Sequence, residues 1–299
     1  EISCSLVGSE MCIRDRILGA GSSMADYRIG FKWWALIIAV VFVISEFVCV
    51  TCVPERPVAC DEKPGKISDM FKALFKNDQA MTVVVSIILV YTSLNICGNL
   101  VLYFFRFDVG NEGAYSIFAA VAFAAQVLVM MVIPLLRKRF SKSQLFISGF
   151  IIQIAGFAVI LIMAFAKLYT PQSWYILCLP GILIYLGYGM LNVIMTIFLS
   201  DSVDYGEVMN GTREESVIFS MQTFTVKLAS GVAVFLAGLV VDWIHLDTAA
   251  AVQTQDTLDA LRMWMTIPSV ILLIVGIFVF KRFYKLDDTR MEEIKSKLN

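Results

Sequence analysis

Long apolar stretches follow one another along the chain, separated by short polar segments. Each is about 20 residues long, the length that an α-helix needs to cross a hydrocarbon core of roughly 30 Å. Helices satisfy their backbone hydrogen bonds within lipid, and the stretches are far longer than the strands of a membrane barrel. The pattern predicts an all-α transmembrane fold with seven spans, near residues 33–53, 81–104, 113–136, 144–166, 174–199, 216–241 and 263–280.

Composition supports a polytopic membrane protein. Hydrophobic residues make up 59% of the 299 and charged residues 16%, and the mean hydropathy is +0.77, which excludes the soluble globular class. We expect membrane lipid as the main solvent and no nucleic-acid partner. The seven cysteines have no paired spacing except CVTC at 49–52, and because no histidine lies nearby we expect no metal site in this chain.

Residues 1–16 do not contribute to the predicted fold. The chain opens with Glu, and residues 4–16, CSLVGSEMCIRDR, resemble translated read-through of a sequencing adapter. We interpret residues 1–16 as a sequencing artefact and expect the natural chain to begin further upstream.

Basic residues predict the orientation. The loops after the first, third, fifth and seventh spans carry 16 Lys and Arg residues, whereas the opposite side carries five. The positive-inside rule then places the C-terminus in the cytoplasm and the start of the first span outside. An odd number of spans with this polarity is what a truncated even-span protein would leave.

The longest cytoplasmic connection, residues 54–80, contains ISDMFKALFKN. Its apolar residues share one helical face, which predicts a short helix lying on the inner membrane surface. Such a segment fits a joint between two halves of a transporter, and it also fits an ordinary amphipathic loop helix.

Three spans carry polar residues at helical spacing. They are Tyr91, Asn95 and Asn99 in the second span, Tyr185, Tyr188, Asn192 and Thr196 in the fifth, and Gln222, Thr223, Lys227 and Ser230 in the sixth. Two interpretations are open: the stripes line a wet cavity, or they form hydrogen bonds between packed helices. The other spans after the first have only isolated polar residues such as Gln153, which favours a cavity lined by these three.

Lys227 lies about eleven residues into its span, or roughly 16 Å from the end at about 1.5 Å per residue. An ammonium at that depth costs about 2.5 to 3.5 kcal/mol on insertion scales. Its position therefore indicates a water-filled cavity, a partner acid or a ligand. The other charge inside a predicted span is Glu46 in the first.

An acidic segment, SDSVDYGEVMNGTREES at 200–216, precedes this span, and we interpret it as a cytoplasmic loop with a turn at Asn210-Gly211. It holds five acids and one basic residue, Arg213. The segment fits either a solvated loop or a charge-paired gate between moving halves.

The run LSDSVDYGEVMNGTREESVIFSMQTFTVKLASG closely resembles the glycoside-pentoside-hexuronide:cation symporters, the melibiose permease family of the major facilitator superfamily. The elements shared are D-x-x-D-Y-G-E from Asp201 to Glu207, R-x-E at Arg213 and Glu215, and Q-T-x-x-x-K at Gln222, Thr223 and Lys227. The spans resemble helices six to twelve of the twelve-helix fold.

The resemblance implies sugar transport coupled to Na⁺, Li⁺ or H⁺ by alternating access. It assigns sugar and coupling contacts to Gln222, Thr223 and Lys227, to which we add the stripe residues Tyr91, Asn95, Asn99, Tyr188 and Asn192. It assigns the cytoplasmic gate to Asp201, Asp204, Tyr205, Arg213 and Glu215. The coupling-cation carboxylates are expected in an N-terminal half that this chain lacks, and Asn192 stands where the melibiose permease has tryptophan.

The resulting division is residues 17–53 as the last helix of the N-terminal half, 54–80 as the middle loop, 81–283 as the C-terminal six-helix half and 284–299 as a cytoplasmic tail. We expect a multi-pass protein of the inner membrane, a monomer, with no enzymatic activity and no organic cofactor. Two alternatives remain open, a seven-helix retinal-type protein or receptor and a non-functional fragment. The first fits poorly because a retinal lysine lies on the last helix, whereas Lys227 lies on the sixth of seven.

Overall fold

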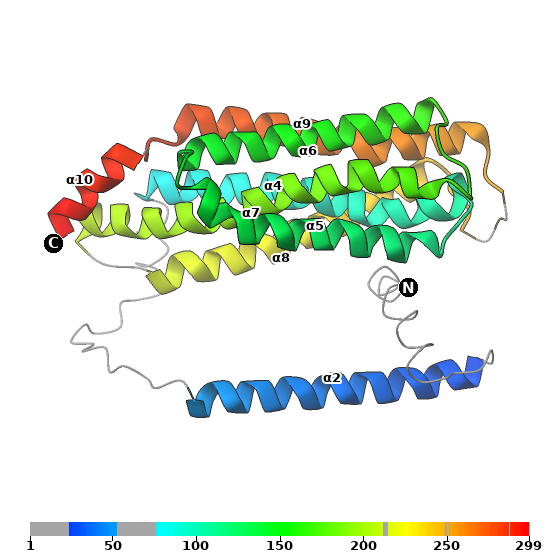
Figure 1. Cartoon of the computed structure of the whole chain (residues 1–299), viewed down its shortest axis with the longest axis horizontal. Helices are drawn as coiled ribbons and strands as arrows, with labels where there is room; N and C mark the ends of the chain where they lie inside the picture. Colours follow the sequence, from blue (N-terminus) through cyan, green and yellow to red (C-terminus); the bar gives the residue numbers. More distant parts are fainter. Residues whose placement is uncertain are drawn as a thin grey trace. The chain divides into compact units, whose positions relative to one another are not determined.

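The computed structural model describes residues 24–52, 76–211, 215–248, 250, 252–286 and 288–298. Its helices are long (Figure 1), and seven are long and apolar enough to cross a membrane, which confirms the predicted all-α fold and the predicted spans. They are α2 (Met24–Cys52), α4 (Asp78–Tyr103), α5 (Ala114–Leu136), α6 (Lys142–Phe165), α7 (Cys178–Asn210), α8 (Glu215–Trp243) and α9 (Gln255–Phe283). A shorter helix, α10 (Asp288–Leu298), follows them.

The chain divides into two compact units, residues 1–65 and 66–299. The described part of the first is α2, an apolar helix whose side chains are exposed wherever they are described. The second unit contains α4 to α10. The predicted surface helix of the middle loop lies in residues 53–75, outside the described residues, and so does Arg213.

Local signals set the helix ends. The Asn77 side chain accepts a hydrogen bond from the Ala80 backbone N–H at 2.9 Å and so caps α4. Ser141 and Gln144 form a capping box at the start of α6. Gly211 closes α7 in the left-handed region at φ 74°, where glycine carries no steric penalty.

The predicted acidic loop at 200–216 is wrong in its first eleven residues, because α7 continues as helix to Asn210. Asp201 and Asp204 are therefore helical residues. The segment contains no proline, and its first strong stop signal is Gly211, so nothing in the backbone ends the helix earlier. Likewise α9 begins at Gln255, eight residues before the predicted span, and this places Arg262 inside the helix.

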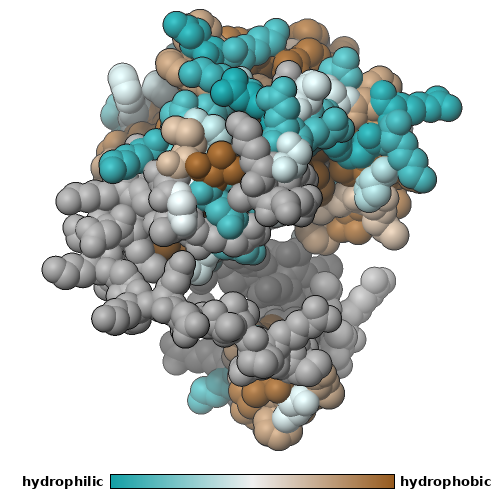
Figure 2. Space-filling model, turned by 90° about the vertical axis from the view of Figure 1, so that its left-hand side faces the viewer, coloured by the Kyte–Doolittle hydropathy of each residue, from teal (hydrophilic) through white to brown (hydrophobic). Residues whose placement is uncertain are grey.

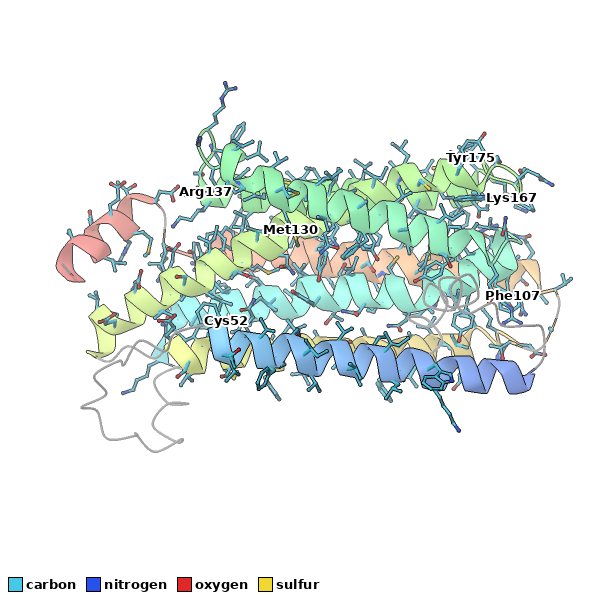
Figure 3. All side chains as sticks on the ribbon, turned by 60° about the horizontal axis from the view of Figure 1, so that its bottom comes forward. Cys52, Phe107, Met130, Arg137, Lys167 and Tyr175 are labelled. Carbon is cyan, nitrogen blue, oxygen red and sulfur yellow. The ribbon has the colours of Figure 1, made fainter. Side chains whose placement is uncertain are left out.

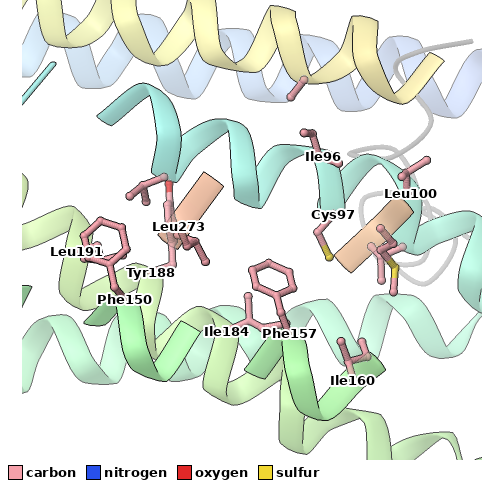
Figure 4. Packing of buried hydrophobic residues seen from close by; sticks show 14 of the residues in the cluster. Ile96, Cys97, Leu100, Phe150, Phe157, Ile160, Ile184, Tyr188, Leu191 and Leu273 are labelled. Atoms are coloured by element: carbon pink, nitrogen blue, oxygen red, sulfur yellow. The ribbon is translucent and has the colours of Figure 1, made fainter. Parts of the chain in front are cut away.

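Helix α4 packs against α7, α8 and α9, while α6 packs against α7 and α9, and α5 against α7. The α6–α7 contact is the tightest at its glycines: a Cβ on Gly187 would lie 2.6 Å from the Gln153 backbone nitrogen, and one on Gly156 would lie 2.7 Å from the Ile184 backbone nitrogen. Figure 4 shows the apolar side chains between these helices, among them Phe157, Ile184 and Leu191. The two backbones therefore approach as closely as small residues in membrane helices permit.

The outward faces of the helices remain apolar. Large side chains such as Phe123, Phe235 and Phe278 are well exposed, as expected where lipid replaces water as solvent. Figure 2 looks onto the end of the molecule at which α10 lies, where many described residues are hydrophilic while hydrophobic ones lie toward the sides. Arg137 lies toward this end in Figure 3, whereas Phe107, Lys167 and Tyr175 lie toward the opposite one.

Candidate functional site

Helices α4 and α7 bring three predicted site residues together in the middle of the bundle. The Asn192 side-chain amide donates a hydrogen bond to the Tyr91 hydroxyl at 2.6 Å. The Tyr91 and Tyr188 rings meet edge to face, with centroids 5.5 Å apart, a favourable arrangement for aromatic pairs. Asn192 and Tyr91 are partly buried and Tyr188 is buried, so this cluster is a polar feature within an apolar bundle.

The remaining residues of the α4 stripe bond within their own helix. Asn95 donates its side-chain amide to the Tyr91 carbonyl, and Asn99 donates to the Asn95 carbonyl, both at 2.7 Å. Both residues are partly buried. Each amide oxygen remains an acceptor, so these side chains retain hydrogen-bonding capacity for a polar ligand.

Among the described residues, the α8 stripe makes no hydrogen bond to Tyr91, Tyr188 or Asn192. Gln222 reaches Thr196 of α7 with a long contact of 3.5 Å, and Thr223 donates to the Phe219 carbonyl of its own helix. Lys227 lies on the exposed side of α8, opposite the buried residues Thr225 and Ala229. The structure thus joins the α4 and α7 stripes and leaves Lys227 without a hydrogen bond or ion pair to another described residue.

A second polar cluster lies where α6, α7 and α10 meet. The Lys142 ammonium donates to the Asp201 carboxylate at 2.5 Å, and both side chains are almost fully buried. The same ammonium lies 3.5 Å from Asp288 of α10, and the Arg137 guanidinium lies 3.4 Å from that carboxylate. Asp201 was predicted as a gate residue, but Lys142 and Asp288 were not, because their spacing along the sequence gives no sign of the contact.

Three other predicted gate residues, Asp204, Tyr205 and Glu215, are among the described residues. Asp204 is half-buried and interacts with other residues, and Glu215 is exposed at the first position of α8. Tyr205 is half-buried and packs against the small apolar cluster of Leu286, Met291 and Ile294. The tail that was predicted only as cytoplasmic therefore forms a helix that contacts the end of α7.

Partial burial of the Asp288 carboxyl would raise its pKa, but the positive charges of Arg137 and Lys142 outweigh burial and lower the pKa below its ordinary value. Tyr284 lies between α9 and α10, and burial together with the carboxylates of Asp201 and Asp288 raises the pKa of its hydroxyl. Asp288 is therefore ionised and Tyr284 protonated at neutral pH.

A third cluster occupies the opposite end of the unit, and sequence reasoning missed it. The Arg262 guanidinium binds both oxygens of Asp108, through Nε at 2.9 Å and Nη2 at 2.5 Å. The Tyr169 hydroxyl also donates to Asp108, and Arg262 donates through Nη1 to Asp259 at 2.7 Å. Asp108 and Arg262 are both only 3% exposed at their side chains, so this is a buried bidentate ion pair.

That ion pair holds an irregular turn. Asp108 ends a π-helical segment, Phe104–Asp108, which continues α4. π-Helical turns are rare and less well bonded than α-helix. The pair fastens this turn to α9 and, through Tyr169, to the connection between α6 and α7.

A comparison with protein families matches residues 6–288 to the family described as MFS/sugar transport protein. Similar curated proteins include the uncharacterized symporter YjmB of Bacillus subtilis, 24% identical over 91% of this chain and 58% of its own length. They also include the raffinose carrier protein of Pediococcus pentosaceus, 24% identical over 93% of this chain and 43% of its own. The isoprimeverose transporter of Lactiplantibacillus pentosus is 25% identical over 90% of this chain and 54% of its own. The chain spans about half the length of these relatives.

Proposed function

The chain belongs to the MFS/sugar transport protein family, and from this premise we propose that it is part of a transporter that moves a sugar across the membrane together with a cation. Family membership and the seven apolar helices among the described residues make it a multi-pass membrane protein, and they support a role as part of a transporter rather than an enzyme. The transported sugar and its coupling are the proposal.

The observation that carries the proposal is the cluster of Tyr91, Tyr188 and Asn192. Ligand sites combine aromatic walls with a few placed polar groups, and a sugar offers both C–H faces and hydroxyl groups to such a wall. Phenol and amide groups can donate to and accept from sugar hydroxyls. Asn95 and Asn99 extend the same stripe of α4, and their amide oxygens accept no hydrogen bond from another described residue. Two of the relatives carry raffinose or isoprimeverose in their names, which supports a glycoside-type substrate.

Lys227 takes the second role in the proposal. It lies mid-helix on an exposed face of α8 beside Thr223, and a lone ammonium at that depth is costly in lipid. We assign it a carboxylate partner or a sugar ligand from outside this chain. A coupling cation, Na⁺, Li⁺ or H⁺, would neutralise acids at that location and so favour sugar binding.

The length of the relatives supports a further step, that this chain corresponds to the C-terminal part of a longer transporter. In that arrangement two halves alternate around a midplane site. The cluster of Asp201, Lys142 and Asp288 would lie at the cytoplasmic end and act in the gate, as the excess of basic residues in these loops suggests. We place the transporter as a monomer in the inner membrane. The family match favours this reading over a retinal-type protein.

Uptake of radiolabelled sugars into cells tests the proposal, with the transporter that contains this chain expressed beside its Lys227→Ala variant. We expect a panel of glycosides, pentosides and hexuronides to include one that accumulates against its gradient, and we expect Lys227→Ala to abolish this accumulation. Lys281→Ala, which removes a lysine from the last turn of α9, is the matched control and should accumulate normally. Undiminished uphill uptake by Lys227→Ala would refute the role of Lys227.

A further inference from the structure

The Lys142 ammonium lies between carboxylates of two different helices. It is 2.5 Å from Asp201 on α7 and 3.5 Å from Asp288 on α10. Its backbone N–H also faces Asp288, at 3.4 Å. One cation is thus shared by a transmembrane helix and by the tail that follows the last transmembrane helix.

The two carboxylates differ in how much water they reach. The side chain of Asp201 is 6% exposed and that of Asp288 is 41% exposed, while Lys142 is 8% exposed. A buried charge without a partner is strongly unfavourable, whereas an exposed carboxylate is solvated by water. This asymmetry explains why Lys142 lies on Asp201, with Asp288 as its second partner.

We propose that Lys142 is a relay between α7 and α10: when another cationic group engages Asp201, Lys142 moves fully onto Asp288 and α10 docks more tightly. The move is small. A direct ammonium–carboxylate hydrogen bond is about 2.8 Å long, so the nitrogen has to shift by less than 1 Å toward Asp288. The flexible lysine stem allows this without a change in the backbone.

Arg137 keeps the second partner in place. Its guanidinium lies 3.4 Å from Asp288, so the carboxylate is held near Lys142 from both sides. The four charged groups, Arg137, Lys142, Asp201 and Asp288, sum to zero. A further cation that binds Asp201 adds one positive charge to this group and displaces Lys142 from Asp201. Asp288 is then the nearby carboxylate that can accept Lys142.

The Tyr284 hydroxyl, close to this ion-pair network, is a hydrogen-bond donor without an acceptor among the described residues. This hydroxyl is buried, and the charges of both Asp201 and Asp288 act on it. A buried hydroxyl gains free energy from any acceptor that it can reach. A movement that brings either carboxylate within hydrogen-bond distance would therefore give Tyr284 an acceptor.

The docking face of α10 links the relay to α7. Leu286, just before α10, and Met291 and Ile294 of α10 are buried and pack with Tyr205, which lies one turn beyond Asp201 on α7. Coupling between two contacts is reciprocal, so a tail that is docked more tightly also stabilises the state in which Asp201 is engaged elsewhere. The consequence for transport rests on the proposed gate, whereas the relay itself is a property of this chain.

Reaction of a buried thiol measures docking directly. Met291 is 2% exposed, so in the full chain with its natural cysteines replaced, a cysteine at Met291 reacts with a maleimide only when α10 undocks. Asp201→Asn leaves Lys142 to Asp288 alone, and we expect the reaction to slow three- to tenfold. Asp288→Asn should accelerate it by a similar factor. Glu292→Gln, which removes an equal charge from an exposed position of the same helix, should leave the rate unchanged.

The double variant Asp201→Asn/Asp288→Asn should react as fast as Asp288→Asn alone, because the relay has then lost both acceptors. An unchanged or faster reaction in Asp201→Asn would overturn the relay. So would a chain that unfolds with Asp201→Asn but folds with Lys142→Met/Asp201→Asn, because Asp288 would then be unable to take over the lysine.

The thiol reaction rates test the relay, the sugar-uptake assay tests the proposed function, and each can be refuted without the other. Thiol rates that follow the expected pattern without sugar accumulation would retain the relay and remove the proposed function. Accumulation that depends on Lys227, together with thiol rates that ignore Asp201, would do the reverse.

Discussion

The Asn192 amide donates a hydrogen bond to the Tyr91 hydroxyl at 2.6 Å and so joins α7 to α4 at the level of the proposed sugar site. The two residues are 101 positions apart in the chain. The bond therefore ties two helices that local sequence cannot relate.

Tyr91→Phe should lower the stability of the chain by about 0.5 to 1.5 kcal/mol, because the Asn192 amide loses its acceptor. Thermal unfolding in detergent measures the change. The double variant Tyr91→Phe/Asn192→Leu should be no less stable than Tyr91→Phe alone. Tyr103→Phe, which alters a tyrosine stacked on Phe107, should change stability by less than Tyr91→Phe does.

Asp108→Asn should be far more costly, since it leaves the buried Arg262 guanidinium without its bidentate partner. Loss of one member of a buried ion pair typically costs about 3 to 5 kcal/mol. Replacing both members, Asp108→Leu with Arg262→Met, should recover most of that loss. The exposed pair of Arg106 and Glu112, 3.9 Å apart, is the control, and Arg106→Gln should cost less than about 1 kcal/mol.

Gly187→Ala should destabilise the α6–α7 contact by about 1 to 3 kcal/mol, the usual cost of overpacking. The new methyl group would meet backbone atoms that cannot turn aside. Gly231→Ala on α8 is the matched control, because a Cβ there meets nothing within 4 Å. In the isolated chain it should be neutral or slightly stabilising, since alanine favours helix. Equal losses for both variants would show that the close contact contributes nothing.

Docking of α10 should weaken at low pH, where Asp288 becomes protonated. The pKa of Asp288 is lowered in the folded chain, so its contribution is present above the ordinary value of 3.8 and is lost as the pH falls through the lower folded pKa. Pulsed EPR between nitroxides at Lys138 and Ser296, both exposed, should give a constant distance from about pH 8 to 5 and a broader distribution below about pH 4. Asp288→Asn should show the broad distribution at every pH.

The spans and the polar stripes could be predicted because the length of an apolar stretch and the spacing of its polar residues are visible in the local sequence. Tyr91, Asn95 and Asn99 lie on one stripe for that reason alone. The end of α7 was predicted too early, although its stop signal, Gly211, is local. Acidic residues such as Asp201 suggest solvent, and the burial of Asp201 is made possible by Lys142, 59 positions away in the chain.

The cluster of Asp108, Tyr169 and Arg262 shows the same limit. Each residue lies near the end of a predicted span, where a charged or phenolic side chain is ordinary and carries no signal of its own. Tertiary packing brings the three together and converts surface residues into a buried network. Lys227 shows the opposite case, because its depth was clear from sequence while no hydrogen bond or ion pair joins it to another described residue.

The glycine contact between α6 and α7 favours movement of the two helices as one rigid pair. Lys142 lies at one end of α6, and Asp201, Asn192 and Tyr188 follow one another back along α7 from that same end. Because the two backbones touch at Gly187 and Gly156, neither helix can slide past the other. We therefore expect a displacement at the charged end to move α6 and α7 together, and with them Asn192 and Tyr188.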